Sequence, residues 1–205
     1  MTLEIWLVYV AAILAMMATP GPSQLLILGN SVANGAARAA FTGAGDLCAN
    51  LLQMLAAGLG LAAILAASEN ALIAVRIAGA LYLLILGIRA FRRASDGRAA
   101  DRPLASRAAL WRQGFFTSAT NPKAVVFFAA LFPQFITPDA PFWPQFAILS
   151  LTYLVIDGLI LSAYAIGAAA IVRCLSGRAR LWAERAGATA MILAAALLAI
   201  RGFSR

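Results

Sequence analysis

Six long apolar segments make up most of this chain, and they constrain its fold more than any other feature. A helix needs about 20 mainly apolar residues to cross a hydrocarbon core roughly 30 Å thick. With 63% hydrophobic residues, 12% charged residues and a mean hydropathy of +0.87, the composition lies outside the range of soluble domains. The sequence predicts an all-α membrane protein in a lipid bilayer, with spans at Leu3–Ala18, Ala39–Ala67, Ala71–Ala90, Phe116–Ile136, Phe142–Val172 and Trp182–Ile200.

Positive charge gathers in the short connections between these segments. The net charge is +8, but most of the arginines flank apolar spans, which indicates membrane topology and no nucleic-acid partner. Residues 68–70 and 137–141 contain no arginine or lysine. By the positive-inside rule the arginine-rich connections are cytoplasmic and both termini lie outside. These arginines are Arg38, then Arg89, Arg92, Arg93, Arg98, Arg102, Arg107 and Arg112, then Arg173, Arg178, Arg180 and Arg185.

The first apolar segment is interpreted as a retained span and not as a secretory signal peptide. A signal peptide carries basic residues before its apolar core. Here the first charged residue is Glu4, and no lysine or arginine precedes Arg38. We therefore expect Leu3–Ala18 to belong to the membrane domain.

The chain divides into two halves of three spans each. Residues 94–109 are polar, arginine-rich and contain Pro103, which is typical of a linker. Three spans per half is an odd number, so the halves would insert with opposite orientation, as in inverted-repeat transporters. We expect one transmembrane domain over residues 1–205, with repeat A at about 1–93, a cytoplasmic linker at about 94–110 and repeat B at about 111–205.

Each half contains a proline break followed by an acidic residue. "ATPGP" at 18–22 follows the first span, and "ATNPK" at 119–123 interrupts the fourth; proline breaks the helical hydrogen-bond ladder in both. Asp46 and Asp157 then lie inside the next span of each half. Two unrelated turns and two chance acids are the alternative, because prolines are common in transmembrane helices.

Asp46, Asn50 and Gln53 form a polar stripe on an apolar helix, since they follow the i, i+4, i+7 pattern. Asp46 is eight residues beyond Arg38, which places it about 12 Å along the helix, close to mid-bilayer. Intramembrane charge is costly and usually marks a pathway. A polar packing seam between helices and a buried ion pair that only fixes the fold are the structural alternatives.

Lys123 is the only lysine among sixteen basic residues. It follows Pro122 directly, inside a predicted span, and an ammonium binds as a compact charge that can lose its proton when buried. A snorkelling lysine at a helix end is the alternative. We expect a buried Lys123 paired with Asp46 or Asp157. Tyr153 and Tyr164 share a face with Asp157 and are weaker candidates.

Four motifs in order resemble the LysE/RhtB family of bacterial amino-acid exporters, over nearly the whole chain. They are Pro20, Gly21 and Pro22, then Gly45 and Asp46, then "GALYLLILG" at 79–87, then Asn121, Pro122 and Lys123 followed by "FFAALFPQF". The resemblance implies efflux of amino acids or their derivatives across the bacterial inner membrane, driven by the proton gradient with no other cofactor. It leaves the substrate open.

A zwitterionic amino acid needs partners for both of its charges. Asp46 and Asp157 can meet the ammonium, while Lys123 and the free N–H groups after Pro22 and Pro122 can meet the carboxylate. A proton and a substrate would then compete for one aspartate, which is antiport. The predicted pathway comprises Asp46, Asn50, Gln53, Asn121, Lys123 and Asp157, the breaks Thr19, Pro20, Gly21, Pro22 and Pro122, and more weakly Ser23, Tyr153 and Tyr164.

Two other functional classes compete with amino-acid export. A metal-ion or small-cation exporter would need clustered ligands, whereas this chain has no histidine, and Cys48 and Cys174 lie far apart as expected packed thiols. An intramembrane enzyme is disfavoured because Ser23 has no evident base. A purely structural membrane protein has no use for an Asp, Lys, Asp set. The sequence leaves association into homo-oligomers open.

Overall fold

The computed structural model describes residues 2–60, 69–95, 104–137, 139–175 and 177–203. Within these residues it contains eight α-helices and no strand, so the all-α prediction is confirmed there. The helices are α1 (Leu3–Met17), α2 (Pro22–Asn34), α3 (Ala36–Gly58), α5 (Glu69–Ser95), α6 (Arg107–Ala119), α7 (Pro122–Leu131), α8 (Phe142–Arg173) and α9 (Gly177–Phe203), with a 3-10 helix at Phe132–Phe135.

One helix can cross a membrane by its own length and composition. In the described part of the chain this is Phe142–Val172 of α8, with a mean hydropathy of 2.0, and α1 with α2 meets the same criterion as a bent pair. Helix α3 contains Asp46, Asn50 and Gln53, so its stretch is less apolar. Part of the second predicted span, 61–67, lies outside the described residues. The six-span arrangement stays a prediction.

The first proline break separates α1 from α2 with a bend of 61°. Gly21 has an extended backbone, and Pro22 occupies the first turn of α2, where its missing N–H costs nothing. The Gly21 amide donates to Gln24 Oε1 at 2.9 Å, which closes the new helix end. The predicted spans left residues 22–34 unassigned, whereas the structure has a helix there.

The second break separates α6 from α7 within the predicted fourth span. Asn121 caps α7, and its Oδ1 accepts from the Lys123 amide at 3.1 Å. Helix α6 already begins at Arg107, inside the predicted linker at about 94–110 and nine residues before the predicted span at Phe116. Ser106 provides the start signal, because its side chain accepts from the Ala109 amide at 3.2 Å.

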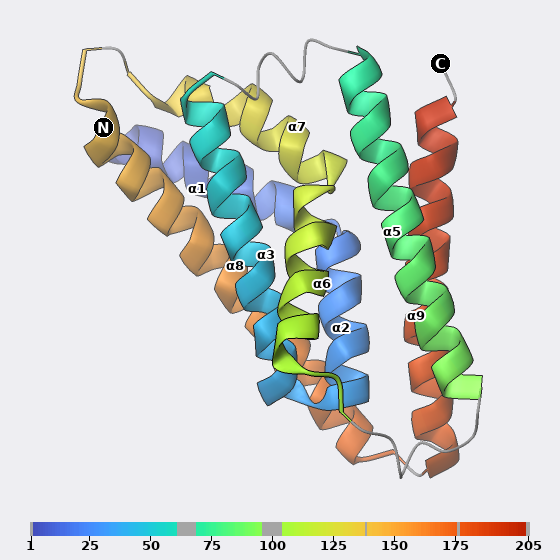
Figure 1. Ribbon diagram of the computed structural model, residues 1–205. Coiled ribbons are helices and arrows are strands. Elements are labelled where there is room, and N and C mark those ends of the chain that lie inside the picture. The colour runs from blue at the N-terminus through green and yellow to red at the C-terminus, as the bar shows by residue number, and fades with distance from the viewer. Residues whose placement is uncertain (1, 61–68, 96–103, 138, 176, 204–205) are drawn as a thin grey trace.

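The two breaks meet inside the bundle. Figure 1 shows α1 and α7 running sideways across the upper half, whereas α2 runs down and α6 runs up beside it. Helices α5 and α9 pair along their length on one side of the bundle. The ends of α2, α5 and α8 and the starts of α3, α6 and α9 lie at the lower end, so the arginine-rich connections share one end.

Two glycines bring α3 and α6 into backbone contact. A methyl group at Gly45 would overlap the Trp111 carbonyl oxygen, and one at Gly114 would overlap the Thr42 carbonyl oxygen. Small residues at such crossings let helices approach closely inside a membrane. The approach sets Asp46, the neighbour of Gly45, beside the last turn of α6.

An aromatic core packs under the breaks. Tyr9 of α1, Phe128 of α7 and Tyr153 of α8 are almost fully buried, and the Tyr9 hydroxyl donates to the Leu149 carbonyl at 3.2 Å. Cys48 and Cys174 do not belong to any core, because both are exposed free thiols. The prediction of packed thiols was wrong, since each cysteine faces outward from its helix.

Candidate functional site

One amide side chain joins three helices at the centre of the bundle. Asn50 of α3 donates through Nδ2 to Asp46 Oδ2 at 2.8 Å and to Asp157 Oδ2 of α8 at 2.9 Å. Ser118 Oγ of α6 donates to Asn50 Oδ1 at 2.8 Å. These four side chains, which we call the central cluster, are at most 4% exposed. The structure therefore brings both halves' aspartates onto one amide nitrogen.

Asp46 keeps one oxygen unused. Its Oδ1 is buried and has no hydrogen-bond partner among the described residues. It lines a cavity of about 20 Å³ together with Asn50, Ser118, Lys123 and Asp157. A space of this size holds about one water molecule. An amino acid does not fit, so the described conformation is closed around the central cluster.

Gln53 continues the polar stripe along α3 without touching the carboxylates. Its Nε2 donates to the carbonyls of Ser118 at 3.0 Å and Ala119 at 3.2 Å. Those carbonyls belong to the last turn of α6, where a helix leaves its C=O groups without intrahelical partners. Gln53 therefore holds the second break in place, and only the Asp46–Asn50 part of the stripe enters the central cluster.

Lys123 does not pair with an aspartate, so the expected ion pair was wrong for this conformation. The ammonium donates to the Thr19 carbonyl at 2.6 Å, on the first break. Lys123 is half-buried and still lines the central cavity. The lysine satisfies a carbonyl that the proline break leaves without an intrahelical donor. One side chain thus ties the two breaks together.

The remaining break residues fall into two groups. Gly21, Pro22, Asn121 and Pro122 are buried, whereas Thr19 and Pro20 are exposed. Ser23 and Asn121 line the central cavity. The free N–H groups predicted after Pro122 are partly used, because Asn121 Oδ1 already accepts from the Lys123 amide.

The two candidate tyrosines lie in different parts of the structure. Tyr153 lines the central cavity and stacks edge-to-face on Phe128 with centroids 4.8 Å apart. Tyr164 lies elsewhere, half-buried against the cluster of Ile27, Leu161 and Ala165. The shared helical face predicted for both tyrosines therefore extends past the cavity.

Sequence reasoning missed Ser118, which completes the central cluster. It also missed Asn30, Thr42 and Gln113, which form a second polar group nearer the arginine-rich end. Ionisable residues stand out inside an apolar span, whereas neutral polar residues do not. The serine and threonine just before "NPK" were the available signal for Ser118.

Comparison with known proteins points to membrane translocators. The family described as LysE type translocator matches residues 14–202. The homoserine/homoserine lactone efflux protein of Salmonella typhi is 34% identical over 203 residues, 97% of this chain and 98% of that protein. The leucine efflux protein of Salmonella choleraesuis is 33% identical over 141 residues, 68% of this chain and 66% of that protein.

A membrane protein of Vibrio cholerae with no named activity is 32% identical over 174 residues, 84% of this chain and 85% of that protein. No solved structure matches the chain significantly.

Proposed function

Because this chain belongs to the LysE type translocator family, we propose that it exports amino acids or their derivatives from the cytoplasm in exchange for protons. The relatives named as homoserine/homoserine lactone and leucine efflux proteins support the direction and the substrate class. The residues of the central cluster, which belong to this chain, support the exchange for protons. The bacterial inner membrane is the compartment in which this exchange would work.

The observation that carries the proposal is the pair of aspartates on Asn50. Asp46 Oδ2 and Asp157 Oδ2 accept from the same amide nitrogen, so the two carboxylates lie within a few ångströms of each other. Two adjacent buried negative charges are strongly unfavourable, and no described basic side chain bonds to either. The pair is neutralised in part by a bound proton, or by the ammonium of a substrate. These two cations exclude one another at Asp46 Oδ1.

Lys123 supplies the opposite charge. Its ammonium lies on the cavity wall and already binds an oxygen, the Thr19 carbonyl. A substrate carboxylate is a stronger acceptor for a cationic donor than a neutral carbonyl. The substrate would therefore lie between the aspartates and Lys123, once the cavity opens beyond its present size.

The architecture favours two inverted repeats. Helices α1, α2, α3 and α5 would correspond to α6, α7, α8 and α9, with one proline break in each set. In Figure 1 the path from α1 down through α2 is reversed by the path up α6 and out along α7. Alternating access would then tilt one repeat against the other around the central cluster. The arginine-rich end would face the cytoplasm.

The test is uptake into proteoliposomes with an acidic interior. Amino acids including homoserine and leucine are offered outside, and Asp46→Asn and Asp157→Asn are compared with the unmodified protein. A lost charge-assisted contact is worth about 1.5–3 kcal/mol, so we expect gradient-driven uptake to fall about tenfold or more. Asp139→Asn is the control, because Asp139 is exposed in a connection between helices.

Each part of the proposal fails on a different result. Full gradient-driven uptake by both aspartate variants would remove the aspartates from proton coupling. Absence of uptake of any amino acid by the unmodified protein would overturn the export function. A divalent cation that replaces the amino acid in driving proton movement would favour the metal-ion exporter.

A further inference from the structure

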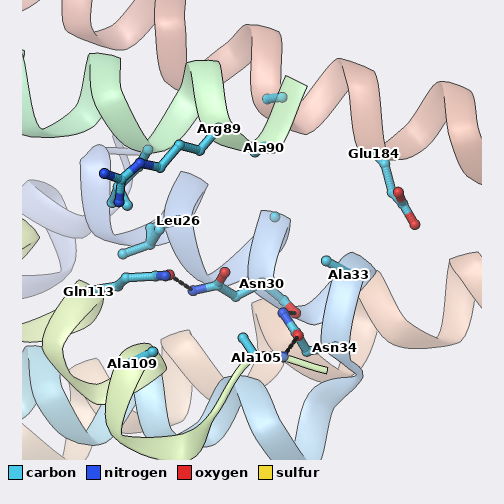
Figure 2. A pocket seen from close by; sticks show the side chains of 13 residues that line it. Leu26, Asn30, Ala33, Asn34, Arg89, Ala90, Ala105, Ala109, Gln113 and Glu184 are labelled. Atoms are coloured by element: carbon cyan, nitrogen blue, oxygen red, sulfur yellow. Dashed lines mark hydrogen bonds between the residues drawn. The ribbon is translucent and has the colours of Figure 1, made fainter. Parts of the chain in front are cut away.

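A second, larger cavity lies at the arginine-rich end of the bundle. It has a volume of about 330 Å³ and is walled by α2, α5, α6 and α9. Cavities that bind small ligands start at about 300 Å³, so this one can hold an amino acid, unlike the central cavity. Figure 2 shows its polar side chains coming from several helices toward one space. We call it the end cavity.

Two neutral amides at its wall are oriented by their own contacts. Asn30 Nδ2 donates to Thr42 Oγ1 at 2.9 Å and to Gln113 Oε1 at 3.0 Å. This arrangement uses the nitrogen of Asn30 and the oxygen of Gln113. In the described part of the chain, Asn30 Oδ1 and Gln113 Nε2 bond to no protein group and border the end cavity. One acceptor and one donor are thus available to a ligand.

Asn34 provides a contrast, because its groups are already used. Its Oδ1 accepts from the Ala105 amide at 2.9 Å, and its Nδ2 donates to the Asn30 carbonyl at 3.2 Å. Asn34 therefore fixes the chain before α6 and closes one side of the end cavity. Not every polar group around this cavity is a candidate ligand contact.

The charged residues of the end cavity have opposite sign and come from different helices. Arg89 of α5 and Glu184 of α9 both line it, and Figure 2 shows them on opposite sides of α2 residues. A guanidinium binds a carboxylate through two parallel N–H groups. Arg89 and the Gln113 amide donor line the same cavity, so its lining matches an anionic group.

Leu26 separates the end cavity from the central cluster. It lines the end cavity and also the narrow gap that Ser23, Thr42 and Asp46 border. Its side chain is 1% exposed, so it is packed between the two sites. A ligand in the end cavity is therefore one side chain away from Asp46.

We propose that the end cavity is a loading site, where Arg89 and Gln113 bind the carboxylate of the substrate amino acid before it passes Leu26. The proposal rests on the proposed export of amino acids and adds a second substrate site to it. It also adds a selectivity rule. Substrates with a free carboxylate gain affinity at this site, and derivatives without one do not.

The test uses substrate pairs that differ in the free carboxylate: homoserine with homoserine lactone, and leucine with leucinamide. Uptake into proteoliposomes gives KM for each with the unmodified protein, Arg89→Gln and Gln113→Leu. We expect Arg89→Gln to raise KM for the free acids about tenfold, and Gln113→Leu about threefold. Both variants leave KM for the lactone and the amide within twofold. Arg92→Gln, one helical turn away and exposed, changes neither.

An equal change in KM for both members of a pair, or no change for the free acids, overturns the loading site while export itself stands. If the unmodified protein transports no member of either pair and no other amino acid, the proposed function fails and the loading site fails with it.

A lipid phosphate is the other anion that Arg89 could bind. The same KM values are therefore measured in liposomes with anionic lipid and in liposomes of phosphatidylcholine alone. An Arg89→Gln effect that disappears in phosphatidylcholine assigns the cavity to lipid and overturns the loading site; an effect that persists supports it.

Discussion

The two polar cavities of this protein differ in size, closure and the state of their polar groups. The central cavity holds about one water molecule, and the side-chain amide of Asn50 donates to both aspartates. The end cavity is about 330 Å³, and an amide oxygen and an amide nitrogen remain available there. Two carboxylates and one ammonium line the central cavity, whereas one guanidinium and one carboxylate line the end cavity.

This difference separates two tasks. The end cavity suits recognition, because Arg89 and two amides with available groups line a space large enough for an amino acid. The central cluster suits coupling, because its adjacent carboxylates require a cation and leave room for a small one only. The conformation then has room for an amino acid at the arginine-rich end and none at the centre.

The largest difference between the two cavities is expected when Asn50→Leu is compared with Asn30→Leu. Asn50 donates to two carboxylates, so its loss leaves buried groups unpaired, and we expect a destabilisation of roughly 3 kcal/mol with transport abolished. Asn30 bonds two neutral groups and is half-buried. Its loss should cost about 1 kcal/mol, and transport continues with a higher KM. Thermal denaturation in detergent and proteoliposome uptake measure both; equal losses would erase the distinction between the cavities.

Removing the wall between the cavities should have a smaller effect on transport. Leu26→Ala leaves a void between the end cavity and Asp46 and costs about 2–5 kcal/mol of stability. If water enters this void, protons reach Asp46 without substrate. We expect proton leak several-fold above the unmodified protein, measured with a pH-sensitive dye inside liposomes that contain no amino acid. Leu7→Ala is the control, because Leu7 is 51% exposed. Equal leak in both variants would show that Leu26 is no barrier.

The smallest effect is expected at Lys123→Arg. The substitution keeps the charge that binds the Thr19 carbonyl, and Lys123 is half-buried, so stability should change by about 0.5 kcal/mol or less. A planar guanidinium cannot place one compact charge in the central cavity. Gradient-driven uptake should fall about threefold, which corresponds to roughly 0.7 kcal/mol. Uptake equal to that of the unmodified protein would make the lysine an interchangeable anchor.

Helical periodicity and charge placement were sufficient to predict much of the central cluster. Asp46 and Asn50 are four residues apart on one helix, so their contact follows from helix geometry alone. Asp157 was singled out because a charge inside an apolar span needs a reason. Ser118 carries no charge and lies at the end of α6, where a serine has many ordinary roles, so its position just before "NPK" is a weak signal.

Tertiary contacts decided the points at which prediction failed. Lys123 has a backbone carbonyl within reach only because the first break lies next to the second, and no spacing in the sequence encodes that proximity. Arg89 was assigned to topology with the other arginines. Its place on a cavity depends on the packing of both α5 and α2 against α9, which hydropathy does not report.

The bond between Lys123 and the Thr19 carbonyl has a consequence for timing. The hydrogen bond from this ammonium holds the second proline break against the first. A substrate carboxylate that binds the ammonium also breaks this hydrogen bond, because the Thr19 carbonyl then has no donor. Substrate binding would therefore weaken the contact between the two breaks.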